Sequence, residues 1–231
     1  MPQTGHTRSP KIQKGALVQL VEELVGILPR IIPFQYNPET LKRSMTPFNP
    51  AEVSEANRGQ LAPTAQPFDP KEQISVEIEL DASDALEDGD GIAEQFGVAD
   101  RIAAIEKLLM PTAGLIGDLL NAAASLVGAS KPAARPSVAI VLFVWGVGRI
   151  LPVRVTSYSI DEQLFLPSLH PVQARVSLGM EVLTPDVFKC QSGLAVDIAV
   201  TAYRFFRLQQ EALALAHSAR NLEAARGLLP F

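Results

Sequence analysis

Cysteine, histidine and tryptophan are scarce in this sequence, and their scarcity excludes several classes of site. The 231 residues include one cysteine, Cys190, so no disulfide can form within the chain. This suits a reducing compartment or a fold that needs no covalent crosslink. The histidines His6, His170 and His217 lie far apart in the sequence and form no cluster with cysteine or carboxylate ligands. We therefore expect no metal and no cofactor.

The sequence also lacks a basic surplus and long apolar runs. Its net charge is −5, whereas a nucleic-acid-binding protein usually carries a basic face. The polar residues 1–14 contain no apolar core of a secretory signal. The apolar stretches 115–127 and 133–147 are shorter than the roughly 20 residues of a membrane-spanning helix. We expect a soluble protein in the cytoplasm that neither binds nucleic acid nor enters a membrane.

Enzyme motifs are missing as well. The sequence contains no nucleophile elbow, phosphate-binding loop, dinucleotide fingerprint or zinc-protease motif. A nucleophile pair of Cys190 and His170 is conceivable, but an isolated cysteine is more often a small buried hydrophobic residue. The acidic run 81–90 fails the calcium-loop pattern, because Leu86 and Gln95 occupy ligand positions counted from Asp84. We expect no enzyme, and an acidic run that caps a helix and is solvated.

Hydrophobic patterning predicts an α+β fold that is mainly antiparallel β. Residues 73–80 and 172–182 alternate between apolar and polar side chains, which indicates half-buried strands. Residues 138–145 are continuously apolar, as in a strand covered on both faces. A hairpin turn at 146–149 leads to a strand at 150–160, which 164–166 continue past a bulge. Residues 167–171 form the next turn.

The N-terminal third is less regular. Residues 1–14 are predicted to be a flexible arm, and 15–25 fit either a strand or a short helix. Pro29 and Pro33 are expected to break that segment before a strand at 31–36, which ends at the Asn37-Pro38 turn. Five prolines between residues 46 and 70 predict a long extended loop.

Helical spacing appears in two places. An insertion at 86–135 contains one helix with an apolar stripe from Ile92 to Leu109, capped by Asp88 and Asp90, and a second helix at 115–128. A long helix is expected at 194–215. The chain therefore divides into the arm at 1–14, a β-domain at 15–185 and a C-terminal helical extension at 186–231.

Three segments, in this order, resemble the tube-domain proteins of contractile injection systems, which are phage-tail-like particles. They are residues 32–44, residues 74–81, and residues 136–176 with their Trp-Gly turn and Pro-Val-x-Ala strand. The signature residues are Phe34, Asn37, Pro38, Asp81, Trp145, Gly146, Phe165, Pro171 and Val172.

The chain departs from the family pattern in three ways. Residues 168–170 stand where a glycine-containing hairpin is usual, the 86–135 insertion is large, and no peptidoglycan-binding module follows the β-domain. The last two departures favour a specialised ring at the baseplate or tube end over the repeated tube subunit.

The resemblance implies a tail-tube-like β-barrel or sandwich. It also implies a hexameric structural ring, stacked between a spike or hub protein and the inner tube protein. Polar residues of two strands would line the lumen of such a ring or simply face solvent: Glu77, Glu79, Gln173, Arg175, Ser177 and Glu181. The inserted helices would contact neighbouring rings or cover their own barrel. Three other functions stay open: a tube-terminating cap, a ligand-binding β-barrel with residues 91–128 as a lid, and a hydrolase that uses Cys190.

Overall fold

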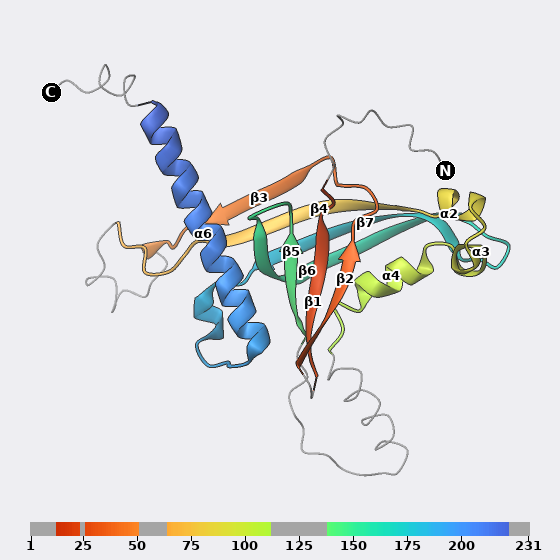
Figure 1. The fold of residues 1–231 in the computed structure, drawn as a ribbon, viewed down its shortest axis with the longest axis horizontal. Coiled ribbons are helices and arrows are strands. Elements are labelled where there is room, and N and C mark those ends of the chain that lie inside the picture. The colour runs from red at the N-terminus through yellow and green to blue at the C-terminus, as the bar shows by residue number, and fades with distance from the viewer. Residues whose placement is uncertain (1–12, 24–25, 51–63, 112–137, 222–231) are drawn as a thin grey trace, which may run out of the picture.

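The computed structural model describes residues 13–23, 26–50, 64–111 and 138–221, and the account below concerns these residues (Figure 1). Their α+β class agrees with the prediction from the sequence. Seven strands form one antiparallel sheet in the order β2-β1-β5-β6-β7-β4-β3, and this sheet is not closed. The strands are β1 (Ala16–Glu23), β2 (Gly26–Pro33), β3 (Leu41–Thr46), β4 (Lys71–Asp81), β5 (Ile140–Val144), β6 (Ile150–Phe165) and β7 (Pro171–Val182). The helices are α2 (Ser83–Glu87), α3 (Gly91–Phe96), α4 (Ala99–Glu106), the 3-10 helix η2 (Pro185–Phe188) and α6 (Leu194–Arg220).

The sheet folds over on itself, and β6 is the strand that passes from one half to the other. Its first residues, up to Val153, pair with β5, whereas its pairing with β7 runs from Val153 to Phe165. A register shift between Val155 and Ser157 follows the point where the partner changes, and such a bulge bends a strand. In Figure 1, β1, β2 and β5 cross steeply over β4, β6 and β7.

Both halves of the sheet share one hydrophobic core. Leu17 and Phe34 from the first half lie in the same buried cluster as Ile74 and Ile78 of β4. The clean alternation of β4 and β7 supplies much of this core, because every second side chain points into it. The predictions for these two strands are confirmed.

Helix α6 covers the outer side of the first half. Ala195 packs with Leu20 and Leu142 in a second cluster, and Tyr203 and Phe206 reach the main core. Strand β5 is therefore buried on both faces, as its continuous apolar sequence predicted. None of the helices in the described residues is long and apolar enough to cross a membrane.

Proline was the main source of error in the N-terminal third. Residues 16–23 form a strand, which settles the open choice between strand and helix. Pro29 and Pro33 do not break the next segment, since both lie in β2. Strand β2 is at the edge of the sheet, where a residue without an N–H group is tolerated. Strand β3 was not predicted.

The turn at 167–171 is present, and Leu169 adopts an unusual backbone conformation in it. Leu166 N donates to His170 O, and Leu169 has a φ of 65°, a conformation that favours glycine. This is the turn where the sequence departs from the family's glycine-containing hairpin. The bulge in β6, however, lies near residue 156 and not beyond residue 160 as expected.

The helix predicted to start near residue 91 is broken in two. Gly97 has a φ of 58° and ends α3, and α4 begins two residues later. Asp90 caps α3 as predicted, accepting from Ile92 N and Ala93 N, whereas Asp88 lies at the end of α2. The predicted stripe is only partly correct, because the break turns Ile92 and Phe96 outward. The predicted helix at 115–128 and residues 1–12 of the arm lie outside the described residues.

Gly97 provides a stability test with an internal control. A Cβ atom on Gly97 would overlap the carbonyl oxygen of Pro171, while a Cβ on Gly89 would meet nothing within 4 Å, although Gly89 also has a positive φ of 71°. We predict that Gly89→Ala lowers the free energy of unfolding by about 1 kcal/mol, and Gly97→Ala by at least about 2 kcal/mol more. Urea denaturation measures both, and equal losses would contradict the proposed close approach of α3 to β7.

Candidate assembly surface

Four neighbouring strands present one continuous polar surface. In β4 and β7 the apolar side chains are buried, and the alternate side chains point away from the core. The register brings these outward residues into rows: Glu77 lies opposite Ser177, which lies opposite Ser159. We call this surface the polar face. It comprises Lys42, Ser44, Gln73, Ser75, Glu77, Glu79, Ser157, Ser159, Asp161, Gln163, Gln173, Arg175, Ser177 and Glu181.

The six residues predicted for a lumen all lie on the polar face. Glu77, Glu79, Arg175 and Ser177 are exposed, whereas Gln173 and Glu181 are half-buried. Arg175 pairs with Glu77 at 2.9 Å and with Glu79 at 3.2 Å. Because these side chains are about half exposed, each pair contributes at most about 1 kcal/mol. The ion pairs orient charged side chains along the polar face. The role of the polar face in a lumen stays a prediction.

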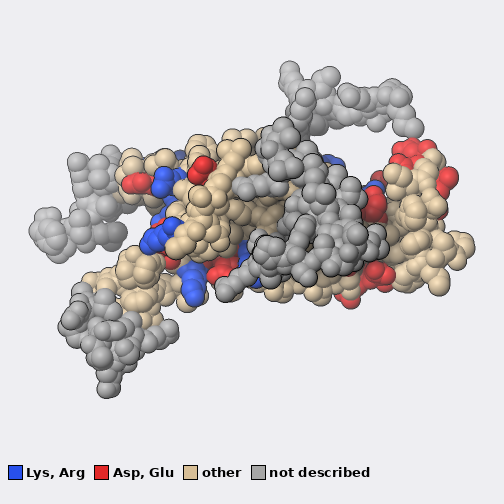
Figure 2. All heavy atoms as spheres, turned by 90° about the horizontal axis from the view of Figure 1, so that it is seen from below, with Lys and Arg blue, Asp and Glu red and all other residues tan. Residues whose placement is uncertain are grey.

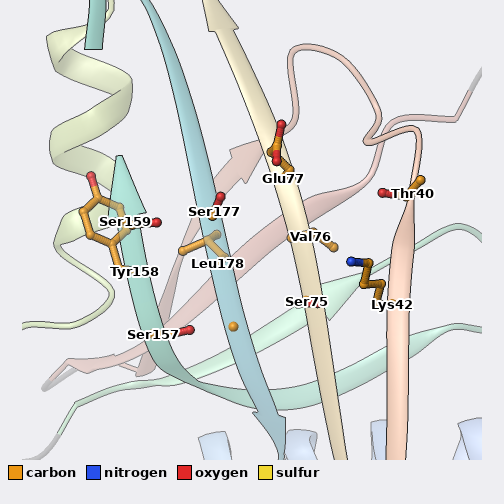
Figure 3. Close-up of a pocket in the computed structure, with 11 residues that line it drawn as sticks. Thr40, Lys42, Ser75, Val76, Glu77, Ser157, Tyr158, Ser159, Ser177 and Leu178 are labelled. Atoms are coloured by element: carbon orange, nitrogen blue, oxygen red, sulfur yellow. The ribbon is translucent and has the colours of Figure 1, made fainter. Parts of the chain in front are cut away.

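Serine hydroxyls form the middle of the polar face, and of these the sequence analysis singled out only Ser177. A groove of about 310 Å³ is lined by β3, β4, β6 and β7, with Ser75, Ser157, Ser159 and Ser177 among its residues (Figure 3). Gly179 lies beside Ser157, and a Cβ there would overlap the Ser157 hydroxyl. The alternation of 157–163 would have revealed Ser157 and Ser159 as outward residues.

Asp81 joins four elements at one end of the polar face. Its backbone N–H donates to Gln35 Oε1 at 3.0 Å, and its carbonyl oxygen accepts from Gln35 Nε2 at 2.8 Å and from Arg101 Nη1 at 2.9 Å. The carboxylate accepts from Ser83 N and Gln173 Nε2. Burial acts to raise the pKa of the Asp81 carboxyl, but these hydrogen bonds and the Arg101 charge outweigh it and lower the pKa.

The other signature residues lie at the two ends of the long strands. Phe34 contacts Phe143 and Trp145 in a cluster with ring centroids 5.8–6.4 Å apart. Asn37 follows this cluster, accepts from Gly15 N and donates to Gln13 O, each at 2.8 Å.

The remaining signature residues belong to turns and strand ends. Pro38 follows Asn37 in the bend after β2, and Gly146, with a φ of 79°, begins the β5–β6 turn. At the opposite end, Phe165 pairs with Pro171, and Val172 accepts from Ala82 N.

The residues considered for catalysis do not come together. His170 precedes β7 and contacts Phe96, whereas Cys190 follows η2 beyond the other end of this 12-residue strand. Cys190 is also exposed, contrary to the expectation of a buried cysteine. His217 lies on the exposed last part of α6, and His6 is outside the described residues. Within the described ranges, no group of three or more His, Cys, Asp or Glu side chains could hold a metal ion.

Charge is distributed unevenly along the molecule. Figure 2 shows acidic side chains gathered at the end where α2 and α3 lie in Figure 1, and basic side chains nearer the opposite end. The acidic end includes exposed Asp84, Glu87, Asp88, Asp90 and Glu94. The predicted solvated run is thus confirmed there.

The unpaired strand edges of the described residues differ in what they can bind. No strand of the described residues pairs with β6 beyond Val153 on its β5 side, so residues 154–165 have a long unpaired edge. In the described part of the chain, β3 and β2 also have one side without a strand partner, and residues 77–81 of β4 extend beyond the end of β3. In β2, Pro29 and Pro33 remove N–H donors, and proline on an edge discourages pairing with another strand. The edges of β3 and β6 carry no proline within 41–46 and 154–165.

Tyr158 anchors β6 to α4 and should make stability depend on pH. Its hydroxyl donates to Glu106 at 3.2 Å, and burial together with the Glu106 charge raises its pKa to about 12. A raised tyrosine pKa favours the folded state below pH 10, and this contribution is lost as pH rises from about 10 to about 12. We predict that Tyr158→Phe makes the fall of unfolding free energy over this range shallower. Tyr203 also has a raised pKa, so part of the fall should persist. An unchanged slope in urea denaturation would contradict the assignment.

Comparison with known proteins assigns no family to this chain. No protein-family model matches it, and no curated protein matches it significantly. The resemblance to tube-domain proteins of contractile injection systems therefore rests on the signature residues alone, and the function it implies is a proposal.

Proposed function

We propose that this protein is a non-enzymatic ring subunit of a contractile injection system. It would form a homohexameric baseplate or tube-initiating ring that links the spike hub to the inner tube. The ordered signature residues support the family. The observation that carries the proposal is the four-stranded unit of β3, β4, β7 and β6, which has a polar face and, among the described residues, an edge on each side that pairs with no strand.

The directions of these four strands suit closure into a ring. Each strand is antiparallel to the next, so β3 and β6 run in opposite directions. A rotation that places β6 of one copy beside β3 of the next would therefore continue the antiparallel sheet. The unpaired backbone groups of both edges would gain partners, which removes the aggregation hazard of a long free edge. The barrel expected from the resemblance would then close only between subunits.

In such a ring the polar face would line the lumen. The apolar side of the same strands is already buried against α4, the first half of the sheet and α6. Among the described residues, the side of the four-stranded unit left for water is thus the side with Glu77, Glu79 and Arg175. A wide polar channel needs this orientation, since an apolar lumen would collapse or bind passing chains.

Exposed apolar residues at the strand ends fit contacts with neighbouring rings. Leu169 at the β6–β7 turn is 80% exposed, and Val147 at the β5–β6 turn is 85% exposed. Phe165 and Ile92 are also exposed beside the first turn. Stacked rings of inner tube and hub proteins would cover such strand ends.

A tube-terminating cap would use the same ring, and it stands as the alternative role within the particle. A ligand-binding barrel is not favoured, since the sheet of one chain is open.

We predict that the full-length protein forms closed rings with a central channel when it is imaged by electron microscopy, either alone or in particles with its hub and tube proteins. Edge-to-edge pairing of β6 with β3 would produce them. A chain that stays a single globule beside the other components of the particle would contradict the proposal.

Two proline variants provide the control for this prediction. Consecutive N–H groups of a strand point to opposite sides of the strand. Of the two variants Ser159→Pro and Ile160→Pro, one therefore removes an N–H group that points to β7. The other, the outward variant, removes an N–H group that points to the unpaired edge. The outward variant should keep a melting temperature near the wild-type value and lose ring formation. Rings that persist in both folded variants would place the interface elsewhere.

A further inference from the structure

Helix α6 carries a second apolar stripe, separate from the face that packs on the sheet. Along the whole helix, mostly apolar residues recur at alternating spacings of four and three, which is the heptad pattern of paired helices. We call this stripe the seam. It comprises Leu194, Ile198, Thr201, Phe205, Leu208, Ala212, Leu215 and Ala219.

The seam is largely exposed. Leu194 is 56%, Phe205 48%, Leu208 64% and Leu215 66% exposed, and only Ile198 packs on the second core cluster. The residues that hold α6 on the sheet are others, namely Ala195, Ala199, Tyr203 and Phe206. All residues from 211 to 220 are exposed, and Figure 1 shows this part of α6 standing clear of the sheet. Within the part of the chain that the structure describes, no other element covers these exposed leucines at heptad spacing.

The charges beside the seam select a second copy of the same helix in antiparallel orientation. Arg204 and Glu211 are exposed and occupy the same flanking heptad position, one heptad apart. In an antiparallel pair, equivalent flanking positions face each other, so Arg204 lies beside Glu211 of the partner subunit and Glu211 beside Arg204 of the partner subunit. In a parallel pair, Arg204 would face Gln209 of the partner subunit and would form no ion pair with it.

The register that pairs Arg204 with Glu211 of the partner subunit also lets the two helices overlap along their length. It puts Phe205 against Leu208 of the partner subunit at the centre, and Leu194 against Ala219 of the partner subunit at each end. The helix runs from Leu194 to Arg220, so the two copies overlap over almost their full length. A shift by one heptad would shorten the overlap and bring Glu211 beside Glu211 of the partner subunit.

We propose that α6 is a self-association surface, which pairs antiparallel with α6 of a second copy of this chain. The interface is twofold symmetric, with the same seam on both sides. Neighbours in a hexameric ring are not related by a twofold rotation, so this pairing would not join neighbouring subunits of one ring. This inference does not depend on the proposed ring, because most of the seam is exposed and takes no part in the packing of α6 on the sheet.

Sedimentation equilibrium of the full-length protein tests the surface. The wild-type chain and Leu213→Glu should show about twice the mass of one chain, because Leu213 is 71% exposed but lies off the seam. Leu208→Glu should raise the dissociation constant of the dimer at least about tenfold. Circular dichroism verifies that each variant is folded. A monomeric wild-type protein, or equal effects of the two glutamates, would overturn the proposal. To keep any ring from masking the result, the experiment is repeated in the outward proline variant of β6.

Charge reversal tests the orientation. Arg204→Glu alone should weaken the dimer by placing two glutamates together, and adding Glu211→Arg should restore affinity. In a Cys190→Ser background, a mixture of Arg204→Cys and Glu211→Cys should form the mixed disulfide in preference to either homodimer. A double variant as weak as Arg204→Glu, or crosslinks between equal positions, would overturn the antiparallel register.

Discussion

The change of partner along β6 is the constraint on which the rest of this structure depends. A 16-residue strand pairs with β5 over its first four residues and with β7 over the remainder, and a bulge follows the change. The sheet can then fold over on itself and bury both its halves against each other. The same step leaves the far part of β6 without a strand partner on one side, as far as the described residues show. The change of partner along β6 therefore accounts for both the shared core and the unpaired edge.

Polar and apolar residues of the long strands are divided by this arrangement. The apolar sides of β4 and β7 complete the core, and their polar sides become one broad surface crossed by the Arg175 ion pairs. Around the rim, Asp81, Gln35 and Arg101 fix the end of β4, while Tyr158 fixes β6 on α4. These contacts tie the four-stranded unit to helix α4 beside it.

Local patterns allowed part of this to be predicted. Strict alternation identified β4 and β7 and correctly assigned Glu77, Glu79, Arg175 and Ser177 to the exposed side. Spacing alone could not locate the break at Gly97, where a tertiary approach to Pro171 demands a glycine. Pro29 was misjudged because only the sheet order shows that β2 is an edge. The free edge of β6 was invisible for the same reason: which strands are neighbours is decided by contacts between distant segments.

Hydrogen exchange at the edges tests the central claim most directly. Backbone amides of the full-length protein are compared between the isolated chain and the assembled particle, at residues 41–46 and 157–165. Pairing of β3 with β6 predicts slower exchange in the particle at outward amides of both segments, and little change in the interior of β7. Equal exchange rates at both edges in the two states would contradict it.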